Sequence, residues 1–315
     1  MIDQSLKSVY EKIIFIGIAA LCLTPLFSPP VALFAGIIFA QFTQNPYPKQ
    51  NHKITHYLLQ ISIVGLGFGM NAATALKAGK EGFFVTMVSI FGTLLLGIIL
   101  GKIFKTDKIT SFLISAGTAI CGGSAIAALS PVVNAEEKQI SVSLGVIFIL
   151  NSIALFLFPP IGNLLHLSQS QFGLWSAIAI HDTSSVVGSA SKFGGEALQI
   201  ATTIKLTRSL WIIPITFLSS FLFKNSSNKI KIPYFIFLFV LAIILKTYFS
   251  FIDNFSPYIV EFSKIGLTLT LFLIGSNLSW KRIKTVGVKP ILQGFILWII
   301  ISVISLIFIV QILGK

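Results

Sequence analysis

Residues 83–100 read FFVTMVSIFGTLLLGIIL, a run of 18 residues without a single charged side chain. An α-helix rises about 1.5 Å per residue, so a run of this length can cross most of a hydrocarbon core about 30 Å thick. Residues 293–313 form a second uncharged run of this kind. Both runs predict transmembrane helices, and the rest of the chain follows the same pattern.

The overall composition excludes a soluble protein. Of 315 residues, 55% are hydrophobic and only 10% are charged, and the mean hydropathy is +0.91, whereas soluble domains carry about 25% charged residues. The net charge of +13 does not indicate a nucleic-acid partner, because no basic face interleaved with aromatic residues is present. Cys22 and Cys121 are isolated within apolar segments, so neither a disulfide framework nor a metal site is predicted.

The chain divides into eleven candidate spans, which leave no room for a soluble domain. They are Lys12–Phe27, Pro29–Phe42, Tyr57–Met70, Gly82–Phe104, Ile109–Val133, Gln139–Phe158, Phe172–Ala190, Leu198–Phe223, Tyr234–Phe249, Pro257–Ile274 and Val288–Leu313. We therefore expect an all-α polytopic membrane protein with about eleven transmembrane helices.

The loop charges predict the orientation of the chain. Lysine and arginine gather in alternate loops, such as the loop that holds Lys102, Lys105 and Lys108. Basic loops stay in the cytoplasm, so we expect a protein of the inner (cytoplasmic) membrane with a cytoplasmic N-terminus and an outward C-terminus.

Two stretches of the chain resemble each other. Residues 62–66 (SIVGL) are similar to residues 263–267 (SKIGL), and Gly69-x-Asn71 is similar to Gly275-x-Asn277. In the predicted topology the two copies run in opposite directions, as in the inverted repeats of secondary transporters. The alternative is a chance similarity between apolar helices, in which glycine, serine and leucine are common.

The fifth span contains paired glycines within SAGTAICGGSAIAA, residues 115–128. A helix interrupted in mid-membrane leaves backbone groups that must line a cavity or meet a ligand, and its N-terminal end favours an anion. We therefore take Cys121, Gly122, Gly123 and Ser124 as candidate substrate-binding residues. The alternative is close helix packing through small side chains, which requires no break.

The seventh span carries an acidic residue, Asp182, deep within an apolar segment. A carboxylate at the bilayer centre costs about 2.5–3.5 kcal/mol, so it usually faces a partner or a wet pathway. His181 beside it can titrate near neutral pH. We interpret His181 and Asp182 as candidate ion-coupling residues, and Thr183, Ser184 and Ser185 as candidate ligands. The alternative is a buried Asp182 that its neighbouring hydroxyl groups satisfy.

The eighth span places two cations on one helix face, because Lys205 and Arg208 are three residues apart. Cations inside a membrane need an anion, which is either Asp182 or a substrate. The planar donors of Arg208 suit the oxygens of sulfonate, phosphate or carboxylate groups. The alternative is that Lys205 extends to the membrane interface. We interpret Asn151 and Asn277 as hydrogen-bonding partners between helices rather than as ligands.

Three motifs together resemble one known family, the YeiH-like sulfate exporter family. They are AICGGSAIAA (residues 119–128), HDTSSVVG (181–188) and KLTRSLWIIP (205–214), and the resemblance extends over nearly the whole chain. The family is grouped with the sodium/proton antiporter and bile-acid symporter folds. The resemblance implies an extra span (residues 1–28) followed by two inverted five-helix repeats (29–165 and 166–315) with discontinuous crossing helices. This layout pairs the fifth span with the tenth, and we prefer it to the pairing of the third with the tenth.

We expect a secondary transporter that exports a small oxyanion, such as sulfate or a sulfonate-derived anion. The anion would lie between the Gly122-Gly123 break and the Lys205/Arg208 face, and His181 with Asp182 would carry the coupling ion. One alternative is a sodium/proton antiporter that uses Asp182; another is an intramembrane enzyme or a scaffold, for which no reactive constellation is present. The expected partners are a small inorganic or organic anion, a proton or sodium ion and the lipid bilayer, with no cofactor and no nucleic acid; a homodimer is compatible with this interpretation.

Overall fold

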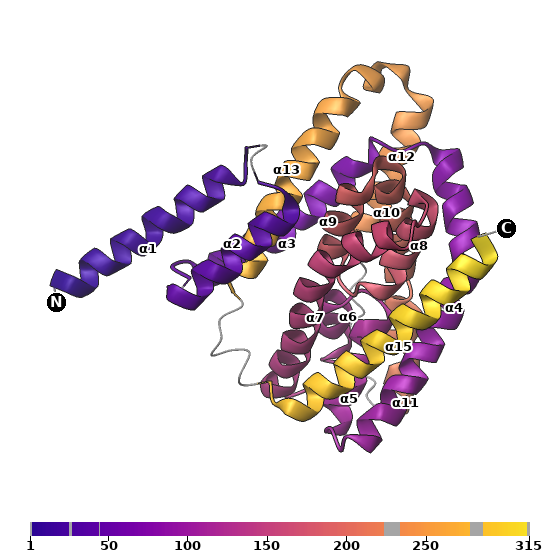
Figure 1. The fold of residues 1–315 in the computed structure, drawn as a ribbon, viewed down its shortest axis with the longest axis horizontal. Coiled ribbons are helices and arrows are strands. Elements are labelled where there is room, and N and C mark those ends of the chain that lie inside the picture. The colour runs from indigo at the N-terminus through magenta and orange to yellow at the C-terminus, as the bar shows by residue number, and fades with distance from the viewer. Residues whose placement is uncertain (1, 25–26, 44, 224–233, 278–285, 314–315) are drawn as a thin grey trace. The chain divides into compact units, whose positions relative to one another are not determined.

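The computed structural model describes residues 2–24, 27–43, 45–223, 234–277 and 286–313, and the secondary structure of these residues is helical throughout (Figure 1). The helices are α1 (Ile2–Leu21), α2 (Pro29–Phe42), α3 (Pro48–Gly67), α4 (Ala72–Ile103), α5 (Lys108–Ala119), α6 (Gly123–Leu129), α7 (Glu137–Leu164), α8 (Gln169–Ala179), α9 (Thr183–Phe193), α10 (Gly195–Ser209), α11 (Ile212–Leu222), α12 (Tyr234–Tyr248), the 3-10 helix η1 (Ser250–Asn254), α13 (Ser256–Gly275) and α15 (Val288–Leu313).

Each predicted span overlaps one helix or two helices in succession, although the bounds differ most for the first span (Lys12–Phe27, against α1) and the third (Tyr57–Met70, against α3). The fifth, seventh and eighth spans are the divided ones, as α5/α6, α8/α9 and α10/α11. Within the described residues, four helical stretches are long and apolar enough to cross a membrane: Phe83–Ile103, Lys138–Leu164, Ser256–Gly275 and Val288–Gln311. The all-α membrane class is therefore confirmed, while the count of eleven crossings stays a prediction. The basic segments 224–233 and 278–285 lie outside the described residues.

The chain forms two compact units. The first unit comprises Met1–Ala72 and Tyr234–Ile283, and the second comprises Ala73–Pro233 and Lys284–Lys315. Each unit therefore contains segments from both of the predicted repeats, 29–165 and 166–315.

In the first unit, α13 packs along both α2 and α3, and α12 packs on α3 (Figure 1). Small residues allow the backbones to approach closely. Gly36 of α2 meets Gly275 of α13 in this way, since a β-carbon added to Gly275 would lie 3.1 Å from the Cα atom of Gly36. The glycines of these apolar helices are therefore packing positions.

The two stretches that resemble each other lie side by side, on α3 and α13. A β-carbon on Gly65 would collide with the hydroxyl of Ser263, and a β-carbon on Gly266 would collide with the hydroxyl of Ser62. The two helices run antiparallel at this contact, because the pairing joins 62 to 266 and 65 to 263. The sequence similarity thus corresponds to a reciprocal packing contact.

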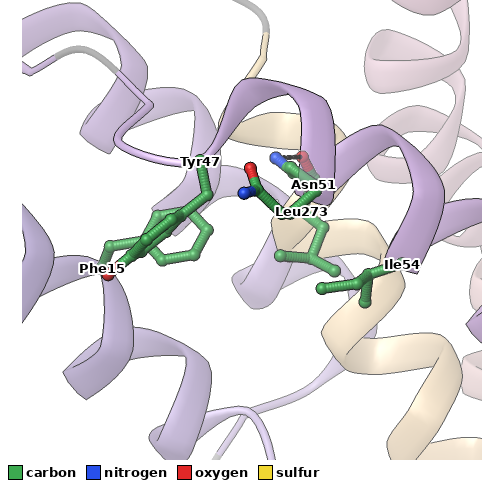
Figure 2. Close-up of a pocket in the computed structure, with 6 residues that line it drawn as sticks. Phe15, Tyr47, Asn51, Ile54 and Leu273 are labelled. Carbon is green, nitrogen blue, oxygen red and sulfur yellow. Dashed lines mark hydrogen bonds between the residues drawn. The ribbon is translucent and has the colours of Figure 1, made fainter.

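A cavity of about 350 Å³ lies within the first unit (Figure 2). Figure 2 shows the rings of Phe15 and Tyr47 on one side and Asn51, Ile54 and Leu273 on the other. The Asn51 amide nitrogen donates to the Leu273 carbonyl (3.1 Å) and to Ser276 Oγ (2.9 Å), and its oxygen accepts from Thr55. The cavity wall is mostly apolar, although Gln50 and Asn51 also line it, and it contains none of the predicted site residues.

The core of the second unit surrounds α8. Phe158 of α7 stacks on Trp175 of α8 with ring centroids 4.2 Å apart, and Phe172 of α8 stacks on Phe193 of α9 at 3.8 Å. The Trp175 indole nitrogen also donates to the Ser302 carbonyl of α15 (2.9 Å). These contacts hold α8 between α7, α9 and α15, and so determine where its C-terminal end lies.

Candidate functional site

The first helix break lies in the second unit at the paired glycines. Helix α5 ends at Ala119 and α6 begins at Gly123, so the break expected at Gly122-Gly123 is present. Gly122 has φ +66°, in the left-handed region that favours glycine, and a β-carbon there would lie 3.4 Å from the backbone nitrogen and Cα atom of Asp182. The two breaks of this unit therefore touch at Gly122 and Asp182.

The second break separates α8 from α9 and has Asp182 at its centre. Asp182 is the N-cap of α9, and its Oδ2 atom accepts from the backbone nitrogen of Ser184 at 3.0 Å and from the Ser184 hydroxyl. An aspartate at an N-cap satisfies an otherwise unpaired amide and stabilises the positive end of the helix. This position gives Asp182 a structural role regardless of any ion it binds.

Side chains satisfy all the backbone carbonyls at the C-terminal end of α8. The Lys205 Nζ atom donates to Ala177 O (3.3 Å) and Ile180 O (2.7 Å). Arg208 Nη1 donates to Ile178 O (3.3 Å), and the Trp298 indole nitrogen donates to Ala179 O (3.1 Å). The last carbonyls of a helix have no partner within it. In an apolar interior each would be costly if left unpaired, so these three side chains make the break possible.

Arg208 joins the two breaks to each other. Its Nε atom donates to Ala119 O at the end of α5 (2.6 Å), while Nη1 reaches the end of α8. Its Nη2 atom has no hydrogen-bond partner among the described residues. Arg208 and Lys205 are both 0% exposed, and within the described part of the chain neither forms an ion pair with Asp182.

The structure brings most of the predicted site residues together around the two breaks. Cys121, His181, Asp182, Thr183, Ser184, Ser185, Lys205 and Arg208 are buried, Gly122 is buried against Asp182, Gly123 is half-buried, and Ser124 is exposed. Asp182 is the most exposed of the three charged residues, at 9%. Both ring nitrogens of His181 are without a partner in the described structure.

Two further residues lie at the site: Asn151, which the sequence predicted only as a hydrogen-bonding partner between helices, and Trp298, which it did not predict. The Oδ1 atom of Asn151, on α7, accepts from the backbone nitrogens of His181 (3.1 Å) and Asp182 (3.2 Å). Trp298, on α15, supplies the donor for Ala179 O. The two bonds that Asn151 accepts agree with its predicted role as a hydrogen-bonding partner between helices. Trp298 gave no signal, because a tryptophan in a membrane helix is common.

Comparison with known proteins places the chain in a family. Residues 8–294 match the family described as Conserved hypothetical protein 698. The chain belongs to this family. No solved structure matches it significantly.

Close relatives of the chain carry one common description, "UPF0324 membrane protein". The relative from Bacteroides thetaiotaomicron is 55% identical over 284 residues, which cover 90% of this chain and 86% of the relative. The relative from Porphyromonas gingivalis is 52% identical (90% and 88% covered), and that from Photobacterium profundum is 50% identical (93% and 90% covered). The family and the apolar helices together make this chain a membrane protein.

Proposed function

We propose that the protein is a secondary transporter of the cytoplasmic membrane that exports a small oxyanion, such as sulfate or a sulfonate-derived anion. The observation that carries the proposal is the environment of Arg208. Its guanidinium is wholly buried, joins the ends of α5 and α8, and keeps Nη2 unpaired among the described residues. A guanidinium stays protonated at neutral pH and suits planar, bidentate recognition of oxyanions.

The charge balance around the breaks also supports an anion. The negative ends of α5 and α8 and the positive ends of α6 and α9 are partial charges of similar size, so they roughly cancel. The full charges that remain are two positive charges, on Lys205 and Arg208, and one negative charge, on the carboxylate of Asp182. A buried excess of positive charge is unfavourable without a counter-ion, and a transported anion would provide one.

The resemblance of the three motifs to the YeiH-like sulfate exporter family agrees with this substrate class. In the proposed mechanism the anion contacts Arg208 Nη2 and the chain near Gly122 and Gly123, where Ser124 is exposed. Asp182 and His181 load and release the coupling proton or sodium ion. Interrupted helices that meet inside one unit are the usual setting for such sites in transporters.

A sodium/proton antiporter is the second candidate, and one observation favours it. Lys205 and Arg208 already have carbonyl partners, whereas Asp182 is more exposed than either and has hydroxyl groups beside it. In that case Asp182 binds the cation, and the two basic residues only hold the helix ends in place.

Transport by the purified protein in proteoliposomes distinguishes the two candidates. The panel is labelled sulfate, sulfite, taurine and sodium, measured with and without a pH gradient. If the protein exports an oxyanion, the wild type should take up at least one anion of the panel. The Asp182→Asn variant should still bind that anion, and the Arg208→Gln variant should not. If only sodium is taken up, and Asp182→Asn abolishes that uptake, the protein is a sodium/proton antiporter and the oxyanion proposal is wrong. The matched control is Lys192→Gln, which removes an exposed charge at the end of α9.

A further inference from the structure

Asn151 is a polar residue in the middle of α7, beside Ser152 and with apolar residues on either side of the pair. Its side chain is 3% exposed, and its neighbours Leu150 and Ala154 belong to the hydrophobic core of the second unit. It reaches the α8–α9 break, where its Oδ1 atom accepts the two backbone hydrogen bonds from His181 and Asp182. The amide thus lies directly against the residues proposed to couple transport.

The two accepted bonds fix the orientation of the amide group. Oxygen and nitrogen of an asparagine side chain are assigned from their hydrogen bonds, and an atom that receives two backbone N–H groups must be the oxygen. The Nδ2 atom, with two N–H donors, therefore points away from these amides. It is buried and has no partner in the described part of the chain.

Asn151 is one of several donors left unused around the same break. Arg208 Nη2 is also buried without a described partner, and so are both ring nitrogens of His181, of which a neutral imidazole offers one as a donor and one as an acceptor. Local backbone acceptors are already taken, because Ala177 O, Ile178 O, Ala179 O and Ile180 O each receive a side-chain donor. Buried donors are normally paired, so the donor-only nitrogens of Asn151 and Arg208 lack an acceptor.

We propose that Asn151 is a specificity-determining residue of the transport site. Its Oδ1 atom holds the α8–α9 break, and its Nδ2 atom donates to an oxygen of the transported anion together with Arg208. The inference rests on the proposed oxyanion transport. It adds a neutral donor, the Asn151 amide, to the charged donor that Arg208 provides. An acceptor-only ligand such as a fully ionised oxyanion satisfies both donors at once, whereas a sodium ion satisfies neither.

The substitution Asn151→Asp separates the two roles of the side chain. It keeps an oxygen for the backbone nitrogens of His181 and Asp182 but replaces the Nδ2 donor with a second acceptor and adds a carboxylate charge, so a measurement on Nδ2 itself separates loss of the donor from charge repulsion. The control is Asn163→Asp, which makes the same change at an exposed position of α7. The purified proteins are compared by thermal unfolding without ligand and by titration with potassium sulfate, potassium sulfite and taurine.

We expect Asn151→Asp to lose some thermal stability, because a carboxylate is costly at this depth in the membrane, and to bind the preferred anion at least 100-fold more weakly than the wild type, with Asn163→Asp unchanged in both. Wild-type affinity in a folded Asn151→Asp protein overturns the inference and leaves oxyanion transport standing. A wild type that binds no anion of the panel overturns both.

If Asn151→Asp does not fold, the contact can still be tested on the unmodified side chain of the wild type. Asparagine labelled with ¹⁵N reports Nδ2 directly, and the Asn151 signal is assigned from its loss in Asn151→Ser. The signal should shift when sulfate or the preferred anion is added to the wild type. An unchanged Nδ2 signal at saturating anion rejects the contact.

Discussion

Ser62 of α3 packs against the bare backbone of Gly266 of α13, and the same contact recurs with the roles exchanged between Ser263 and Gly65. Each helix supplies one hydroxyl and one glycine, three residues apart. The Ser263 hydroxyl also donates a hydrogen bond within α13, to Ile259 O at 2.7 Å. The reciprocal arrangement explains why the two stretches look alike: both must satisfy the same contact from opposite sides.

This contact predicts a coupled pair of substitutions. Gly65→Ala forces a methyl group onto the Ser263 hydroxyl and should destabilise the folded protein by about 1–3 kcal/mol, as overpacking does. Adding Ser263→Ala removes the colliding oxygen and should recover much of that loss. Thermal unfolding of the four proteins of this double-mutant cycle in detergent measures the coupling. Gly92→Ala is the control, because a β-carbon there meets nothing within 4 Å; additive effects at 65 and 263 would contradict the packing account.

Arg208 should contribute to both stability and anion recognition. Arg208→Gln leaves Ala119 O and Ile178 O without their present donor and should weaken anion binding by about 2–3 kcal/mol, as the loss of a charge-assisted hydrogen bond does. Arg208→Lys keeps the charge but loses the planar fork, so it should insert and fold better than Arg208→Gln while still binding the anion poorly. Binding titrations on both variants test this, and unchanged affinity in a folded variant rules out the anion-binding role.

Asp182 is expected to couple transport to a proton or sodium ion. Asp182→Asn keeps an oxygen that can cap α9, so the fold should survive. A permanently neutral side chain cannot load and release an ion, so gradient-driven flux should vanish while anion binding persists. Flux and binding are measured on the same reconstituted samples. Normal gradient-driven flux would limit Asp182 to its capping role. Misfolding that Arg208→Gln rescues would indicate that the two charges balance each other.

Trp298 should stabilise the second unit partly through the hydrogen bond of its indole nitrogen, in addition to the ring contacts with Phe158 and Phe295. Trp298→Phe leaves Ala179 O unpaired in the interior, which costs about 1–3 kcal/mol. Trp211→Phe is the control, because the Trp211 ring contacts Phe83 and Phe91 and its indole nitrogen donates to none of the carbonyls at the end of α8. Thermal unfolding of the two variants is compared with wild type, and an equal shift for both would show that ring size, rather than the hydrogen bond, is responsible.

The orientation of the chain is tested by reporter fusions. Because basic residues gather in alternate loops, the N-terminus is expected in the cytoplasm and the C-terminus outside. Alkaline phosphatase fused after Lys315 should be active, and a green fluorescent protein fused there should be dark. The opposite pair of results would refute an odd number of crossings.

The sequence predicted the helices well, because helix formation in a membrane depends on local composition. Pro29–Phe42 was predicted residue for residue, and the break at Gly122-Gly123 followed from paired glycines. For α3 the predicted span began at Tyr57, whereas the helix begins at Pro48. Residues 48–53 are polar, so they fall outside the apolar stretch that defined the predicted span, although they are helical.

What the sequence by itself determined was the membrane class, the run of apolar helices and the few polar residues that interrupt them, since each of these depends on side chains alone. The partners of Lys205 and Arg208 were decided by the tertiary structure. Every residue carries the same backbone carbonyl, so no sequence pattern marks Ala119 O, Ile178 O or Ile180 O as unpaired. Those carbonyls become acceptors only because α5 and α8 end inside the packed second unit, within reach of α10.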